Sequence, residues 1–405
     1  MKYINFIVGA VAWVPYFVPI VIEGNRQGIV SNFFLRKNPK AYADPYFGDH
    51  LNQIQQVANN YNIKIHSIKK VINYPGLTFL MEADISGRSS KDYSTAGITH
   101  LNKSHLKVSF TFNADFIWQY HRYIKSVDYV VLPGKSYEEA YSKFSPKNVY
   151  LGSPKFDIKF NTNKIFKKYH LLPSNRHLLF FYPKTKWINT SAQLVGHVPK
   201  IKHLVNAFKK MGFKVIIKSR EKDRVTQSMG DYYFEETDLF PNSSLELLHI
   251  CKLAVFFSSA TIEECVMSSI PFIDFKVDHK FNRFGFLHHS SYSRIISNLS
   301  IPYQELHKHV NAITTKNNAD CFTNMQKKHM FVNEDFSKKL LEHFREESDK
   351  KYNDAVKIYS EMKTLKDKHN EISKKRGENV NPILQKIDDE LSKEKDKNKT
   401  NEGNH

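Results

Sequence analysis

Three hydroxyl side chains follow an apolar run that reads as a buried strand, and two carboxylates come directly after them. The hydroxyls belong to Ser258, Ser259 and Thr261, and the carboxylates to Glu263 and Glu264. Hydroxyls and free backbone N–H groups at the start of a helix bind anions, so this segment is suited to a diphosphate. A carboxylate one turn into the helix is suited to the hydroxyls of a ribose. The same pattern also fits an ordinary helix start, with Ser or Thr as the N-cap and Glu completing a capping box.

Two cations end another apolar run and suit the same chemistry. Lys218 and Arg220 follow the residues VII, so both come at the end of an expected strand. Fixed cations at such a place stabilise the negative charge that builds on a departing diphosphate, and no metal ion is then needed. A solvated basic loop is the alternative interpretation of the same residues.

The first half of the chain offers three candidates for a general base, a group that would deprotonate an acceptor hydroxyl. Asp84 follows the strand that ends at Met81, and Asp115 follows the strand that ends at Phe112. His100 is the third candidate. Each of the three also fits a turn or a helix cap, and the sequence leaves the choice among them open.

These residues need two separate sheets to position them, because they follow strands in both halves of the chain. In the first half the pattern predicts strands over 3–8, 29–35, 78–81, 106–112, 129–132 and 148–151, and helices over 17–27, 48–61, 114–124 and 137–144. In the second half it predicts strands over 177–182, 214–218, 253–257 and 271–275, and helices over 201–211, 244–251 and 261–268. Such alternation is typical of parallel sheets with helices on both faces.

The fold class that follows is α/β, with two Rossmann-like domains facing a cleft. We expect an acceptor domain over 1–157, a linker over 158–174 and a nucleotide-donor domain over 175–311. A charged helical extension over 312–391 and a disordered tail over 392–405 complete the chain, because the apolar residues become sparse there.

The apolar run from Ile4 to Ile22 is about long enough to cross a bilayer, so a membrane anchor is one interpretation. Pro15 and Pro19 interrupt the run, and no small-residue cleavage site ends it. We therefore favour a buried strand followed by a helix.

The composition excludes a disulfide-stapled fold and wholesale disorder. Of the 405 residues 41% are hydrophobic, and only three are cysteines. The formal net charge of +19 favours anionic partners. Because the basic residues are spread along the chain and no nucleic-acid-binding motif occurs, we expect phosphorylated donors and an anionic membrane or polymer, and no nucleic acid.

Taken together, the motifs resemble those of the GT-B glycosyltransferase superfamily over about residues 2 to 287. The resemblance is greatest to the bacterial surface-polymer enzymes that include the CDP-glycerol glycerophosphotransferases. It rests on the segments 151–157 (LGSPKFD), 215–220 (VIIKSR), 244–248 (SLELL), 257–259 (FSS), 263–264 (EE) and 270–271 (IP).

The resemblance implies a metal-independent, cofactor-free transferase that moves a sugar from a nucleotide-activated donor to a glycan, polymer or lipid-linked acceptor. It assigns Ser258, Ser259 and Thr261 to the donor phosphates and Glu263 or Glu264 to the ribose. We expect a cytoplasmic enzyme, with peripheral attachment to the inner face of the membrane left open.

Three alternative functions remain at this point. A CDP-glycerol-type glycerophosphotransferase and a nucleotide-sugar 2-epimerase share the expected architecture. A basic nucleic-acid-binding protein is the alternative that involves no catalysis.

Overall fold

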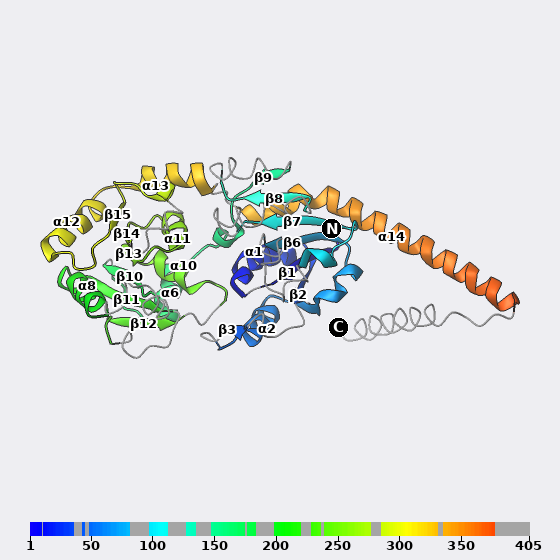
Figure 1. Cartoon of the computed structure of the whole chain (residues 1–405), viewed down its shortest axis with the longest axis horizontal. Helices are drawn as coiled ribbons and strands as arrows, with labels where there is room; N and C mark the ends of the chain where they lie inside the picture. Colours follow the sequence, from blue (N-terminus) through cyan, green and yellow to red (C-terminus); the bar gives the residue numbers. More distant parts are fainter. Residues whose placement is uncertain are drawn as a thin grey trace. The chain divides into compact units, whose positions relative to one another are not determined.

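The structure is a computed structural model with two compact units, Met1–Asp349 and Lys350–His405. Both large sheets belong to the first unit (Figure 1). The structure describes residues 1–9, 11–35, 43–44, 48–81, 97–111, 127–134, 147–174, 176–183, 198–219, 228–235, 239–276, 285–330 and 335–376. The helices expected over 114–124 and 137–144 and the tail expected over 392–405 lie outside these ranges.

The first sheet has seven strands in the order β5-β2-β1-β6-β7-β8-β9, and every neighbouring pair is parallel. Its strands are β1 (Tyr3–Val8), β2 (Val30–Leu35), β5 (Lys64–Ser67), β6 (Gly76–Met81), β7 (His105–Phe110), β8 (Tyr129–Leu132) and β9 (Asn148–Tyr150). Two short strands, β3 (Ala43–Asp44) and β4 (Gly48–Asp49), form a separate antiparallel pair. The parallel sheet predicted for the first half is confirmed.

Helices cover one face of this sheet and short 3₁₀ segments contribute to the other. Residues of α1 (Val14–Arg26), α2 (His50–Asn60) and the start of α14 (Phe336–Arg376) pack with Phe6, Phe33 and Phe79. On the opposite face, η3 (Ile68–Asn73) and η4 (Gly97–His100) pack with the alternate strand residues. This alternation along each strand is what the two-residue period of a pleated strand requires.

The apolar run near the N-terminus is divided between β1, the 3₁₀ turn η1 (Val11–Trp13) and α1. The helix begins three residues before the position expected from the sequence, because Pro15 stands in its first turn, where the missing N–H of proline costs nothing. Pro19 lies inside α1, and the helix continues past it. Within the part of the chain that the structure describes, no helix is both long and apolar enough to cross a membrane.

A row of polar side chains, buried except for the half-buried His66, runs across the middle of the first sheet. The Asn32 amide donates to Asn5 Oδ1 over 3.1 Å, and the Asn5 amide donates to Thr78 Oγ1 over 3.4 Å. His66 Nε2 lies 3.2 Å from Asn32 Oδ1, and His105 Nδ1 lies 3.1 Å from Thr78 Oγ1. Because a shift of one residue would point each side chain to the other face, these bonds help to fix the strand register.

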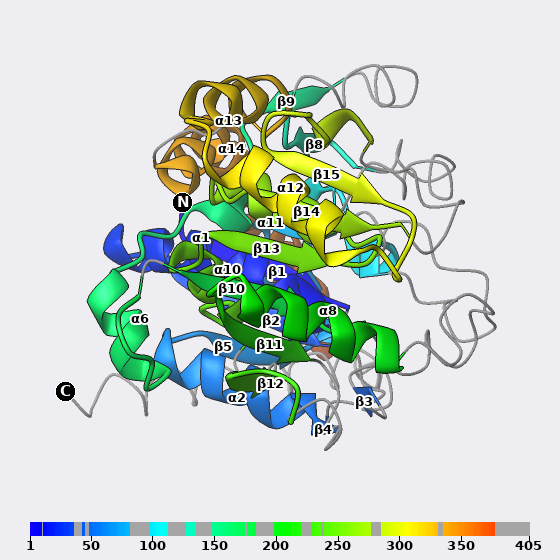
Figure 2. The same ribbon diagram turned by 90° about the vertical axis from the view of Figure 1, so that its left-hand side faces the viewer.

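The second sheet has six parallel strands in the order β12-β11-β10-β13-β14-β15 (Figure 2). They are β10 (His177–Phe181), β11 (Lys214–Ser219), β12 (Tyr232–Glu235), β13 (Leu253–Phe256), β14 (Phe272–Phe275) and β15 (Ser293–Ile296). The second predicted parallel sheet is thus confirmed, and the sequence analysis missed its two outer strands, β12 and β15.

Two different helix layers bury the faces of the second sheet. Helices α8 (Val198–Lys210) and α12 (Tyr303–Thr314) pack on one face with residues such as Phe180. On the other face, strand residues such as Leu179 pack against a larger set of short helices. These are α6 (Thr162–Lys168), α10 (Ser243–His249), α11 (Thr261–Met267) and α13 (Ala319–Met325).

The charged C-terminal part contains the helix α14, in agreement with the helical pattern expected there. A short π-helical segment, η10 (Gln326–Met330), follows α13. Helix α12 crosses residue 312, at which we expected the extension to begin, and α6 lies within the segment that we expected to be a linker.

Candidate nucleotide site

The second sheet has a topological switch point between its two central strands. From β10 the chain passes to β11 and β12 on one side, and it then returns to β13, β14 and β15 on the other. In open parallel sheets the crevice outside the carboxyl ends of strands at such a point is where ligands bind. Ser258 comes two residues after the end of β13, so the predicted donor segment starts at this position.

Ser258 has an unusual backbone conformation at this strand end. Its φ of 43° lies in the left-handed region, which a residue with a Cβ adopts only when its surroundings hold it there. The Ser258 N–H donates to Asp274 Oδ1 over 2.7 Å, and Asp274 belongs to the neighbouring strand β14. This bond fixes the direction in which the chain leaves β13.

Asp274 and His288 form a second layer beneath that turn. The other carboxylate oxygen of Asp274 lies 3.4 Å from His288 Nε2. The sequence analysis missed both residues. Asp274 was detectable in principle, since it is the polar residue of the otherwise apolar strand FIDF and stands near its carboxyl end.

The hydroxyls of Ser259 and Thr261 lie beside each other. Their oxygens are 2.8 Å apart, and the Thr261 N–H donates to Ser259 Oγ over 3.3 Å. The N-cap residue of α11 is Ala260, with no side-chain capping bond, so the capping box considered from the sequence is not formed here. The two hydroxyls and the turn at Ser258 therefore lie together at the carboxyl end of a central strand.

Glu263 and Glu264 are both buried on the seven-residue helix α11. Glu264 Oε1 forms an ion pair of 2.5 Å with Lys155 Nζ, and the side chains are only 11% and 13% exposed. Burial by itself would lower the pKa of Lys155, but the charge of Glu264 and its hydrogen bond raise this pKa above the ordinary value. Glu264 is thus held in place by a cation that the sequence analysis did not connect with it.

Lys155 belongs to η8 (Pro154–Phe156), the short segment that follows the first sheet. Its ammonium also lies 5.8 Å from the ring centroid of Tyr16, a residue of α1. The next residue but one, Asp157, accepts a hydrogen bond of 2.8 Å from the backbone N–H of Ser337, in α14. The segment LGSPKFD, on which the resemblance partly rested, therefore joins elements from three parts of the chain.

Of the two predicted cations, Lys218 is described and Arg220 is not. Lys218 is buried near the carboxyl end of β11, beside β10 in the sheet, where it pairs in register with Phe181. Since β10 is one of the two strands at the switch point, Lys218 lies near the carboxyl ends of the central strands, which is where the prediction requires it.

The first sheet has an equivalent switch point between β1 and β6. Asp84 comes three residues after the end of β6 and Asp115 comes five residues after the end of β7, and both lie outside the described residues. His100 is described, half-buried, in η4, which packs against η3, the segment that leads into the start of β6.

The cysteines and the acidic residues bear on two other kinds of chemistry, thiol catalysis and metal binding. Cys251 and Cys265 are buried, and burial raises the pKa of both thiols, which keeps them protonated. Within the described ranges no group of three or more His, Cys, Asp and Glu side chains is placed to hold a metal ion.

Comparison with known proteins identifies the fold. No family model and no curated protein sequence matches the chain. Among solved structures, the UDP-GlcNAc 2-epimerase of Neisseria meningitidis, solved with UDP-GlcNAc bound, is 11% identical with a TM-score of 0.54, over 85% of this chain and 100% of that one. The UDP-GlcNAc 2-epimerase of Methanocaldococcus jannaschii is 12% identical with a TM-score of 0.53, over 84% and 99%.

The wall teichoic acid polymerase TagF is similar as well. One of its structures is 10% identical to this chain with a TM-score of 0.57, over 87% of this chain and 90% of that one. These structures are GT-B enzymes, so the GT-B fold inferred from the sequence motifs is confirmed.

Proposed function

We propose that the protein is an enzyme that uses a nucleotide-activated donor and transfers the donor's sugar to a cell-surface or glycoconjugate acceptor. The observation that carries the proposal is the turn from Ser258 to Thr261, which places two adjacent hydroxyls at the switch point of the second sheet. The similar structures support it, since they include an epimerase with UDP-GlcNAc bound and a wall teichoic acid polymerase soaked with CDPG.

Each part of the site has a role in this proposal. Ser259 and Thr261 donate hydrogen bonds to the donor diphosphate, and Glu263 or Glu264 accepts hydrogen bonds from the ribose. Lys218 and Arg220 stabilise the charge that develops on the departing diphosphate, so that the reaction needs no metal ion. Asp84 or Asp115 deprotonates the acceptor hydroxyl, since both follow strands of the first sheet at their carboxyl ends. His100, in η4, is the third candidate for this base.

A thermal-shift panel of UDP, CDP, GDP and their sugar or glycerol conjugates tests the proposal. A ligand that binds only the folded protein at about one hundred times its Kd stabilises it by about 2.7 kcal/mol, which raises Tm by several degrees. The double variant Ser259→Ala with Thr261→Val should lose that shift and keep its own Tm. Ser300→Ala, an exposed serine of the same half of the chain, is the matched control.

The outcomes separate the function from the site. If no nucleotide stabilises the protein, the proposed function is wrong. If a nucleotide stabilises the double variant as much as the wild type, the function stands and the assignment of Ser259 and Thr261 fails.

A 2-epimerase is the second candidate, favoured by the epimerases among the similar structures. An epimerase acts on the nucleotide sugar alone, whereas a transferase needs an acceptor. Incubation with UDP-GlcNAc in the absence of an acceptor therefore distinguishes them, since only an epimerase changes the configuration at C2 of the sugar. Stabilisation by CDP-glycerol in preference to nucleotide sugars would instead favour glycerophosphate transfer.

A further inference from the structure

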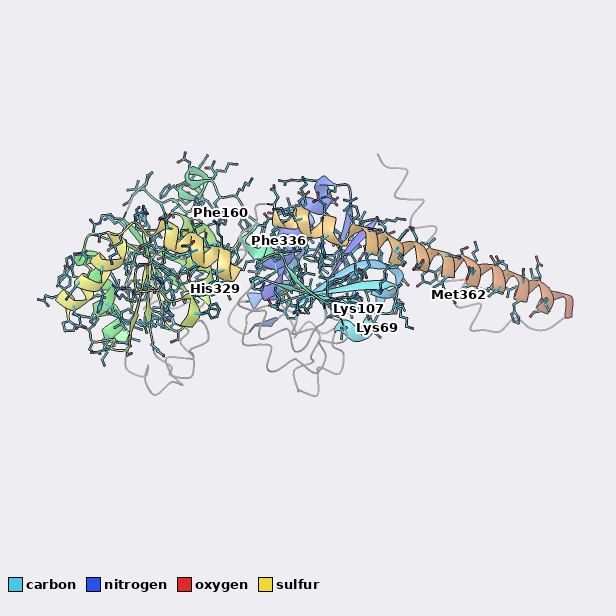
Figure 3. All side chains as sticks on the ribbon, turned by 90° about the horizontal axis from the view of Figure 1, so that it is seen from above. Lys69, Lys107, Phe160, His329, Phe336 and Met362 are labelled. Atoms are coloured by element: carbon cyan, nitrogen blue, oxygen red, sulfur yellow. The ribbon has the colours of Figure 1, made fainter. Side chains whose placement is uncertain are left out.

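The second half of α14 carries an exposed apolar stripe. At the start of the helix, Phe336, Leu340, Leu341 and Phe344 are buried in the core of the first sheet. Beyond Asp349 the large apolar residues become exposed: Ile358 by 55%, Met362 by 60%, Leu365 by 65% and Ile372 by 49%. Figure 3 labels Met362 on this part of the helix. A soluble helix normally buries such a stripe against something.

The spacing of the stripe indicates what kind of partner covers it. The stripe residues alternate steps of three and four, which is the heptad repeat of a coiled coil with its seam at positions a and d. The exposed series is Ile358, Met362, Leu365, His369 and Ile372. A repeat of 3.5 residues keeps its seam toward another helix over its whole length, whereas a lipid surface imposes no such period.

We propose that residues 358–372 form an antiparallel two-stranded coiled coil with the same segment of a second copy of this chain. In this pairing Met362 of each copy packs against Leu365 of the other, and Ile358 packs beside His369. The contact surface is then the same on both chains, as a twofold axis requires.

Charge complementarity supports this partner and this register. Glu361 and Lys368 are exposed and both stand at position g, beside the seam. When Met362 faces Leu365 of the second copy in the antiparallel arrangement, Glu361 comes opposite Lys368 of that copy. The twofold axis forms the same pair again with the roles exchanged, so that two pairs of opposite charge flank the seam.

The helix that carries the seam already exists in the single chain. It is continuous with residues that are buried in the core of the first sheet, so pairing does not have to nucleate it.

Sedimentation of the full chain over a range of micromolar concentrations tests the proposal. We expect a reversible dimer. Leu365→Lys places a charge in the seam and should raise the dimer dissociation constant by at least about a hundredfold. Val356→Lys is the matched control, because Val356 is exposed by 46% on the same helix but stands outside the seam. Unchanged Tm values would show that both variants remain folded.

Charge reversal tests the register. Glu361→Lys or Lys368→Glu alone converts two opposite-charge contacts into like-charge contacts and should weaken the dimer by about tenfold to thirtyfold. The double variant Glu361→Lys with Lys368→Glu should restore wild-type association. Failure of the double variant to restore it would overturn the antiparallel register.

Three further results would overturn the proposed partner. One is a monomeric wild-type chain at all concentrations. Another is a monomer that dimerises only when residues 377–405 are removed, which would make the chain's own C-terminal segment the occupant. The third is a Leu365→Lys variant that associates as the wild type does but no longer binds vesicles of anionic lipid. This result would assign the stripe to a membrane.

Discussion

The Lys155 ammonium and the Glu264 carboxylate form a nearly buried ion pair between two segments that are 109 residues apart in the sequence. Lys155 belongs to the segment that follows the first sheet, and Glu264 belongs to α11, the helix that follows the candidate phosphate turn. The position of α11 therefore depends on a residue outside the second sheet.

Lys155→Ala should destabilise the protein by about 3 kcal/mol or more, because it leaves the Glu264 carboxylate buried without its cation. Lys155→Met combined with Glu264→Gln removes both charges and keeps most of the side-chain volume, so the double variant should recover most of that loss. Urea denaturation of the wild type, Lys155→Met, Glu264→Gln and the double variant measures the coupling energy. Equal stabilities of Lys155→Ala and the wild type would show that the ion pair contributes nothing to the fold.

Arg220→Ala should lower turnover by about a hundredfold with a smaller effect on KM for the donor, since the proposed cation acts on charge that develops during the reaction. Lys214→Ala is the control, because Lys214 is an exposed cation at the first position of β11, the strand that ends at Ser219. Steady-state kinetics with the donor identified by the thermal-shift panel give both constants. Normal turnover in the Arg220 variant would remove this residue from the proposed mechanism.

The central strands were predictable from the sequence because they are buried on both faces and therefore read as continuous apolar runs. Among the missed strands, β5, β12 and β15 are at the outside of the two large sheets and are partly exposed, so they lack such runs. Among the missed helices, α6 has a single buried residue, Ile165, in a lysine-rich segment.

Part of the candidate site could be predicted from the sequence for a related reason. Ser258, Ser259 and Thr261 are close in sequence and follow a buried strand, so their positions could be read locally. The partners Asp274 and Lys155 are brought to them only by the order of strands and the packing of η8. Asp274 stands out as the polar residue of an apolar strand, but its contact with Ser258 and that of Lys155 with Glu264 join distant segments, and such contacts have no local pattern in the sequence.

Acidification should destabilise the protein between about pH 6.5 and pH 4. Burial, with a smaller effect of Lys328, lowers the pKa of His329 to about 4, so the unfolded chain takes up a proton at a pH where the folded protein does not. Stability is therefore complete above the ordinary pKa of histidine and falls as the pH drops below it, by about 2 kcal/mol at pH 5.

Urea denaturation of the wild type and of His329→Gln at pH 7 and pH 5 measures this effect. The variant should lose about 2 kcal/mol less than the wild type over this interval, because glutamine has no proton to gain. His66 and His177 also have lowered pKa values, but their effect on the pH dependence of stability is the same in the wild type and in the variant. The same pH dependence in the two proteins would contradict the role of His329.

The lysines near the C-terminus should attach the protein to anionic vesicles in a salt-dependent manner. Residues 350–376 contain eight lysines, and each contributes about 1 kcal/mol near an acidic membrane surface. Truncation after Asp349 should abolish co-sedimentation and keep nucleotide binding, because it leaves the first unit intact. A cut after Ala312 would be unsuitable, since it divides α12 and removes Phe336 and Phe344 from the first core.

Two comparisons control this measurement. Neutral vesicles should not bind the protein at any salt concentration. Leu365→Lys should bind anionic vesicles at least as well as the wild type, because it adds a positive charge on the exposed part of α14. Vesicle binding that persists after truncation at Asp349 would locate the attachment in the first unit.

The first sheet begins at Tyr3, yet its core is completed by Phe336, Leu340, Leu341 and Phe344, which follow the entire second sheet in the chain. On the ribosome the N-terminal half therefore emerges without the helix that covers part of its apolar face. Because synthesis proceeds at about 5 to 20 residues per second, that part of the apolar face stays uncovered for many seconds after β9 has been made. The helices that cover the second sheet lie near its strands in the sequence. The core of the second sheet can therefore form before the core of the first sheet is complete.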